Sequence, residues 1–230
     1  MGQWGNAGYG RVLKAVVFDF DGVLADTEGL HLRTFQAVFD DRGWTLERAA
    51  YYDRYLGYDD RDLVTAFAGD QRLAVTDDEI GEIVREKTER FSQYLASAAV
   101  LFPTARAAVA RLLPRYSLAI ASGSLSGEIT AILNHAGLTP AFRAIVGADD
   151  VLRRKPAPDP YVEAVSRLGV APASAVAIED SRWGLASAHA AGLRTIAITT
   201  SYAAPELSPA DAIVDSLDDV TPELIDRLFT

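Results

Sequence analysis

The chain of 230 residues contains no cysteine. This absence excludes disulfide bonds, thiol catalysis and metal sites built from thiolates. The sequence also lacks any run of about 18 apolar residues, so it predicts no membrane span. Its first residues, MGQWGNAGYGR, have no apolar centre of the kind that a signal peptide needs, and we therefore expect a cytoplasmic location.

The chain has fewer basic than acidic residues. The chain has 22 lysine and arginine residues against 32 aspartate and glutamate residues, which gives a formal net charge of −10. We therefore expect neither nucleic acid nor an anionic membrane as a general partner, because both require a basic surface. A local group of hydrogen-bond donors could still bind a small anion. We expect a monomer or a weak dimer.

Short apolar runs alternate with helical patterns from Tyr116 onward. Strands are expected at four of these runs, SLAIAS (117–122), RAIVGA (143–148), SAVAIED (174–180) and LRTIAIT (193–199). Helices are expected between them, at GEITAILNHAG (127–137), DPYVEAVSRLG (159–169) and RWGLASAHAAG (182–192). With a further strand at Leu13–Phe18, this alternation predicts an α/β fold with a doubly wound, Rossmann-like parallel sheet.

Residues 29–98 have a different pattern. Apolar residues recur at helical spacing in LHLRTFQAVFDDRG (30–43) and EIGEIVREKTERFSQYLAS (79–97), and no stretch has a convincing strand pattern. Thr76 and Glu79 form the capping-box pattern at the start of the second helix. We therefore expect an inserted helical domain at 29–98, with residues 1–28 and 99–230 forming the α/β core.

Carboxylates follow the first predicted strand in AVVFDFDGVLADT (15–27). Successive side chains of a strand alternate between faces, so Asp19 and Asp21 should point the same way, roughly 6–7 Å apart. Parallel sheets bind ligands beyond the carboxyl ends of their strands. Ser122 and the pair Glu179-Asp180 also end predicted strands, Lys155 follows another, and we expect all of them at one locus. Adjacent carboxylates favour a hard cation with oxygen ligands there, because a cation relieves their repulsion.

These segments resemble the four motifs of the haloacid dehalogenase-like (HAD) hydrolase superfamily. The motifs are DFDGVLADT, the strand-ending Ser122, Lys155 in KPAPDPY, and IEDSRWGLASAHAAG. Their order and spacing match over nearly the whole chain, and the helical insertion resembles the four-helix cap of the family. Within the superfamily the chain is similar to the branch of beta-phosphoglucomutase, phosphoglycolate phosphatase and CbbY-like proteins.

The resemblance implies a role for each core residue. Asp19 would be the nucleophile that forms an aspartyl-phosphate, and Asp21 would be the general acid–base. Ser122 and the Gly123 N–H would bind phosphate oxygens, and Lys155 would offset negative charge. Mg²⁺ would be the cofactor, held by Asp19, the backbone carbonyl of Asp21, Glu179 and Asp180.

The activity implied is that of a Mg²⁺-dependent phosphatase of a small phosphorylated metabolite, a sugar phosphate or phosphoglycolate. Two alternatives remain open, a phosphosugar mutase of the beta-phosphoglucomutase type and a non-catalytic phosphate-binding module. Leu125 stands where the mutase has a basic residue, which disfavours the mutase. Asp21 disfavours true dehalogenation, because release of halide requires no acid.

Two residues of the insertion are candidate substrate contacts. His31 matches a histidine of beta-phosphoglucomutase-like sequences, and Arg61 lies in YLGYDDRD (55–62), which resembles the substrate-facing loop of the cap, with Gly57 as a hinge. For His31, packing within a helix explains the residue equally well. For Arg61, a solvated charged loop is an equally good explanation. The aromatic stretch YYDRY (51–55) is interpreted as part of the core of the insertion.

Overall fold

The computed structural model describes residues 14–56, 58, 60–97 and 100–230. The chain divides into two compact units, one formed by Met1–Ala25 with Leu101–Thr230 and the other by Asp26–Val100. The second unit extends the insertion expected at 29–98 by two or three residues at each end. The glycine-rich start of the chain, Leu13 and the expected hinge Gly57 lie outside the described residues.

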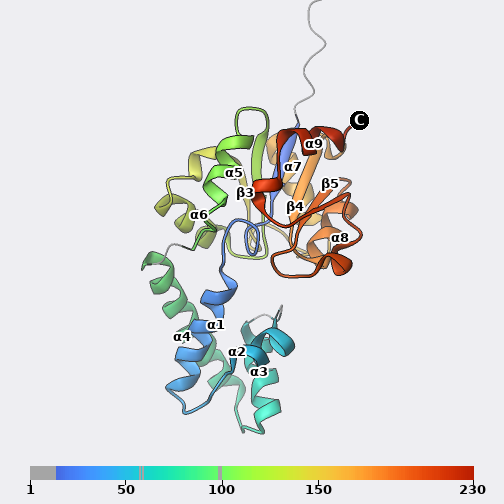
Figure 1. The fold of residues 1–230 in the computed structure, drawn as a ribbon. Helices are drawn as coiled ribbons and strands as arrows, with labels where there is room; N and C mark the ends of the chain where they lie inside the picture. The colour runs from blue at the N-terminus through green and yellow to red at the C-terminus, as the bar shows by residue number, and fades with distance from the viewer. Residues whose placement is uncertain (1–13, 57, 59, 98–99) are drawn as a thin grey trace, which may run out of the picture. The chain divides into compact units, whose positions relative to one another are not determined.

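A six-stranded sheet forms the centre of the first unit, in the order β3-β2-β1-β4-β5-β6 (Figure 1). Every paired neighbour is parallel. The strands are β1 (Ala15–Phe18), β2 (Ser117–Ala121), β3 (Phe142–Val146), β4 (Ala175–Glu179), β5 (Arg194–Ile198) and β6 (Ala212–Val214). The α/β class, the parallel sheet and the predicted strands are therefore confirmed. The sequence did not predict β6, because a strand of three residues between aspartates shows no alternation.

Helices flank this sheet. They are α5 (Ala105–Leu112), α6 (Ser126–His135), α7 (Asp159–Leu168), α8 (Arg182–Ala190) and α9 (Pro222–Arg227), with 3₁₀ turns at Thr139–Ala141, Pro172–Ser174, Ala204–Leu207 and Leu217–Asp219. Ala15 and Val17 face one side of β1, in one core cluster with residues of α7 and α8. Val16 and Phe18 must face the other side by strand alternation, and both are fully buried. The sheet is thus covered on both faces, as a doubly wound fold requires.

Among the described residues of the second unit, the regular elements are helices. It contains α1 (Glu28–Asp40), α2 (Arg48–Ala50), which runs directly into the π-helical turn Tyr51–Tyr55, α3 (Asp60–Gln71) and α4 (Asp77–Ser97). Its core includes the rings of Phe35, Phe39 and Phe67 together with Tyr51 and Tyr55. The YYDRY stretch therefore contributes two rings to the core of this unit.

The start of α4 shows why the helix begins where it does. The backbone N–H of Glu79 donates to Thr76 Oγ1 at 3.3 Å, and the backbone N–H of Thr76 donates to Glu79 Oε2 at 2.7 Å. This reciprocal pair is the predicted capping box, and it satisfies two backbone donors at the helix terminus. Within the described ranges, no helix has the length and apolar character needed to cross a membrane.

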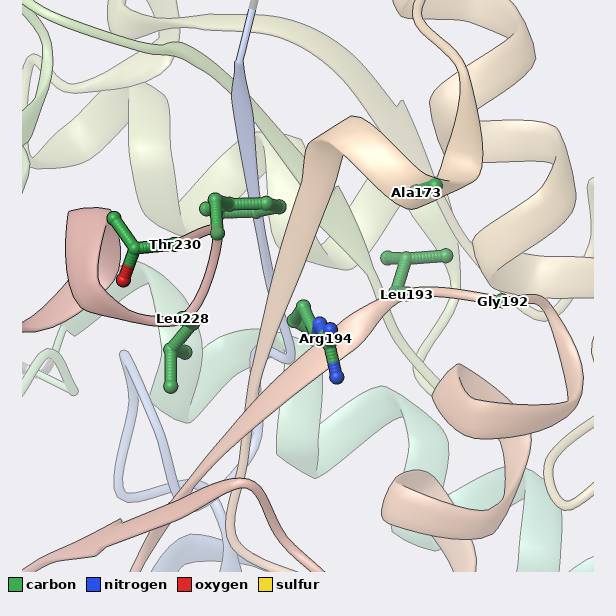
Figure 2. A pocket seen from close by; sticks show the side chains of 7 residues that line it. Ala173, Gly192, Leu193, Arg194, Leu228 and Thr230 are labelled. Carbon is green, nitrogen blue, oxygen red and sulfur yellow. The ribbon is translucent and has the colours of Figure 1, made fainter.

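A cavity of about 420 Å³ lies against the first unit (Figure 2). Its lining consists of Ala173, Gly192, Leu193, Arg194, Leu228, Phe229 and Thr230. Ala173 precedes β4 and Arg194 begins β5, so the cavity lies at the amino ends of the strands. The predicted acids follow the carboxyl ends of the strands. This cavity is therefore separate from the candidate active site.

Candidate active site

The candidate site lies where the strand order reverses. Connections lead from β1 through β2 to β3 in one direction, whereas β4, β5 and β6 extend in the other. Such a switch point opens a crevice beyond the carboxyl ends of the two central strands. Asp19 directly follows β1, Glu179 is the last residue of β4, and Asp180 follows it. Oxygens of these three carboxylates lie within 4.8 Å of one another.

Two glycines allow the acids to come this close. Gly22 has φ +77°, and a Cβ atom there would lie 1.9 Å from Asp180 Oδ2. A Cβ atom at Gly184, in α8, would lie 1.8 Å from Glu179 Oε1. Any larger residue at either position would displace a carboxylate, so the tight turn after Asp21 and the start of α8 are part of the site.

Lys155 brings a cation to the acids from the loop between β3 and α7. Its Nζ donates to Asp19 Oδ1 at 2.8 Å and to Glu179 Oε1 at 2.5 Å. Burial acts to lower the pKa of Lys155, but the carboxylates of Asp19 and Glu179 outweigh it and raise the pKa above its ordinary value. The lysine is therefore charged across the physiological range.

One lysine does not balance three buried acids. Asp19, Glu179 and Asp180 expose 7%, 0% and 5% of their surface, so each carboxylate has lost most of its water. Burial first, and then the charge of Glu179, raises the pKa of Asp19 well above its usual range and that of Asp180 to about 7. A divalent cation would relieve this repulsion, and carboxylate oxygens are the ligands that Mg²⁺ prefers. The residues present therefore fit the expected metal.

Asp21 lies in a different environment from the three clustered acids. Its Oδ2 accepts hydrogen bonds from Ser122 Oγ at 3.0 Å and from Ser124 Oγ at 2.7 Å. The backbone N–H of Ser124 donates in turn to Ser122 Oγ at 3.0 Å. The turn through Gly123 thus directs two hydroxyl groups toward the expected general acid–base. A bound phosphate would have to compete with Asp21 for the proton of Ser122.

The carboxylates have further donors that sequence reasoning did not single out. Tyr161 Oη donates to Glu179 Oε1 at 2.7 Å, and Ser181 Oγ donates to Glu179 Oε2 at 3.0 Å. Ser201 donates to Asp180 Oδ2. Tyr161 and Ser181 lie within the motifs KPAPDPY and IEDSRWGLASAHAAG, so their position was a signal. Ser201 follows β5 and had no such signal.

The two residues predicted to contact substrate from the insertion lie in the second unit. His31, in α1, stacks on Phe91 with ring centres 4.2 Å apart, and Lys87 Nζ lies 2.7 Å from its Nδ1. Lys87, in α4, is 3% exposed and also donates to both carboxylate oxygens of Asp60 at 2.8 Å. Lys87 lies in the predicted helix EIGEIVREKTERFSQYLAS (79–97), but sequence reasoning did not identify it as a cation of this cluster.

Arg61 has a different setting from His31. Its side chain is 53% exposed and pairs with Asp77 at 3.1 Å. An exposed pair of this kind contributes little to stability. The environment of Arg61 is therefore that of a solvated surface charge.

The packing of His31 leads to a prediction about pH. Burial and the charge of Lys87 lower the pKa of His31 to about 3. The folded state therefore holds the ring neutral, whereas the unfolded chain protonates it at the ordinary histidine pKa. This contribution to the free energy of unfolding is complete above that pKa and declines as the pH falls below it. NMR titration should show no protonation of His31 above pH about 5, and between about pH 6.5 and 5 the native chain should lose up to about 2 kcal/mol more stability than His31→Gln. A normal titration near the ordinary value would contradict this packing.

Comparison with known proteins adds to this geometry. The family model described as haloacid dehalogenase-like hydrolase matches residues 16–198. Protein CbbY from Rhodobacter capsulatus is 34% identical, over 94% of this chain and 99% of that protein. Fructose-1-phosphate phosphatase YqaB from Escherichia coli (strain K12) is 30% identical, over 79% of this chain and 94% of that protein. A crystal structure of CbbY from Rhodobacter sphaeroides in complex with xylulose-(1,5)bisphosphate has a TM-score of 0.78 at 31% identity and covers 90% of this chain and 96% of that one.

The family match begins within β1 and ends with β5, so it includes all four of the motifs found in the sequence. The two CbbY proteins named above fall within the branch that the motifs indicated. On this combination of motifs, sheet topology and similarity over most of its length, the chain belongs to the haloacid dehalogenase-like hydrolase family.

Proposed function

We propose that this phosphatase of the haloacid dehalogenase-like family hydrolyses a small phosphorylated sugar or carboxylate through an aspartyl-phosphate on Asp19, with Mg²⁺ as cofactor. The observation that carries the proposal is the buried group of three acids at the switch point of the sheet, two of which, Asp19 and Glu179, pair with Lys155. Phosphatase activity in the relative YqaB and the bisphosphate bound to CbbY support a phosphate ester as substrate.

Asp19, Asp21 and Lys155 have separate roles in the proposed reaction. A carboxylate oxygen of Asp19 attacks phosphorus while Asp21 gives a proton to the leaving oxygen, and Asp21 then takes a proton from the water that attacks the aspartyl-phosphate. Because hydrolysis is split into two steps, the carboxyl group of Asp21 acts as the acid in the first step and as the base in the second. The charge of Lys155 favours the ionised form of Asp19 and offsets the charge of the phosphoryl group.

The phosphate would be held beside these two acids. Ser122, which is 1% exposed, and the N–H of Gly123 supply donors for its oxygens. Mg²⁺, held by Asp19, Asp180 and the backbone carbonyl of Asp21, with Glu179 direct or through water, would shield the attacking carboxylate from the anionic phosphate. His31 and Arg61 remain candidate contacts for the rest of the substrate.

Phosphatase is favoured over mutase by the residue that follows the serines. Leu125 is 44% exposed and apolar at the position where the mutase has a basic residue. A mutase must hold a substrate with two phosphate groups in two orientations, so the loss of a basic contact there weakens that reaction. The occupied catalytic positions argue against a merely phosphate-binding module.

A phosphate-release screen tests the proposal. Purified protein should release phosphate from at least one ester among fructose 1-phosphate, xylulose 1,5-bisphosphate, other sugar phosphates and phosphoglycolate. Treatment with EDTA should lower the rate at least tenfold, and Mg²⁺ should restore it, because hard oxygen ligands bind a hard cation. Full turnover in metal-free protein would contradict the metal assignment. Conversion of one sugar phosphate into its isomer without phosphate release would favour the mutase.

A further inference from the structure

Tyr161 occupies a buried position that the ring of a phenylalanine would fill without the hydroxyl group. The residue is 0% exposed and belongs to the core cluster between α7 and the sheet. A buried hydroxyl group without a partner destabilises a protein, so a tyrosine at such a position needs an acceptor. That acceptor is Glu179 Oε1, at 2.7 Å.

The same oxygen of Glu179 also accepts from the lysine of the site. Lys155 Nζ donates to Glu179 Oε1 at 2.5 Å and to Asp19 Oδ1 at 2.8 Å. The Nζ atom also lies 5.0 Å from the ring centre of Tyr161. One residue of α7 thus contacts Glu179 through its hydroxyl and Lys155 through its ring. A hydrogen-bonded chain leads from Tyr161 through Glu179 and Lys155 to the expected nucleophile.

The direction of the hydrogen bond is fixed by charge. Burial first, and then the charge of Glu179, raises the pKa of Tyr161 well above its ordinary value, so the phenol keeps its proton and donates it. Glu179 is 0% exposed, so bulk solvent does not reach it to replace a lost donor. Removing the hydroxyl would leave Glu179 less stabilised as an anion and less restrained in position.

We propose that Tyr161 is a positioning residue, whose hydroxyl orients the Glu179 carboxylate so that it can hold Lys155 against Asp19 and take part in binding the cation. Donors of this kind behind metal-binding carboxylates typically change metal affinity or activity 10–100-fold when they are removed, an order-of-magnitude guide. The inference rests on the proposed function, because it assigns Glu179 to that metal-binding group.

Tyr161→Phe removes only the hydroxyl and keeps the ring. We expect about a tenfold or larger loss of Mg²⁺ affinity, measured by titration calorimetry on the full chain without substrate, and a fall in kcat with KM little changed. Tyr116→Phe is the matched control. Its hydroxyl is also hydrogen-bonded, to the backbone oxygen of Pro222 and to Asp226, remote from the acids. This control should lose comparable thermal stability and keep the Mg²⁺ affinity of the native chain.

A double-mutant cycle with Glu179→Gln separates positioning from a general loss of packing. If Tyr161 acts through Glu179, adding Tyr161→Phe to Glu179→Gln should cause almost no further loss of Mg²⁺ affinity. Additive losses would overturn the inference, and so would a Tyr161→Phe protein with native Mg²⁺ affinity. Should the native chain itself bind no Mg²⁺, the metal assignment in the proposed function would fail, and this inference with it.

Discussion

Replacing Asp19 by asparagine is expected to lower turnover of every phosphate ester by a factor on the order of a thousand or more. The amide nitrogen and oxygen of asparagine are poor nucleophiles toward phosphorus, and no other carboxylate of the site follows β1 directly. The loss should appear in kcat and should be the same for good and poor leaving groups, because attack by Asp19 precedes every later step. Steady-state kinetics on p-nitrophenyl phosphate and on the best substrate of the screen would measure it.

Asp215→Asn provides a matched control for this change. Asp215 follows β6 on the surface and accepts a hydrogen bond from Thr199 Oγ1 at 2.9 Å, which asparagine can also accept. That variant should retain native activity. Retention of more than about a tenth of native kcat by Asp19→Asn would assign the nucleophile elsewhere.

Asp21→Asn should separate substrates by their leaving groups. General acid catalysis contributes about 10²–10⁴-fold when the leaving oxygen must be protonated, as in an alkyl sugar phosphate. The p-nitrophenolate ion leaves without protonation, so its release in the first turnover should change much less. A rapid-mixing experiment should therefore show a burst of p-nitrophenol followed by slow turnover, because water now lacks its general base.

The same experiment on the sugar phosphate completes the test of Asp21. Its first turnover should be slowed by two to four orders of magnitude, an order-of-magnitude range for loss of a general acid. Asp19→Asn should give no burst on either substrate. Equal slowing of the first turnover on both substrates would show that Asp21 supports the structure of the site and not proton transfer.

Much of the core could be predicted because its patterns are local. Runs such as SLAIAS are buried on both faces, and strand direction alone places Asp19 and Glu179 at one edge of the sheet. Strand β6 and helix α9 were missed, since three and six residues are too few to show a periodicity. Only elements long enough to show a hydrophobic periodicity of their own could therefore be predicted from the sequence.

The donors around the acids depend on distant pairing. Ser201 reaches Asp180 from the loop after β5, and Lys87 joins α4 to His31 and Asp60. Nothing in the sequence near Asp180 or His31 indicates these partners, because the contacts arise only when the elements fold together. The sequence predicted which groups would react, and the structure adds the hydrogen-bonding partners that surround them.

The central claim is that the phosphoryl group passes through Asp19, and chemical trapping tests it most directly. Borohydride reduces an acyl phosphate, so an aspartyl-phosphate at position 19 would become homoserine, which peptide mass spectrometry can locate. Asp21→Asn should be used with p-nitrophenyl phosphate and Mg²⁺, because this variant should form the intermediate and hydrolyse it slowly. We expect substrate-dependent homoserine at position 19. Substrate turnover with no modification there, or with modification of a different residue, would contradict it.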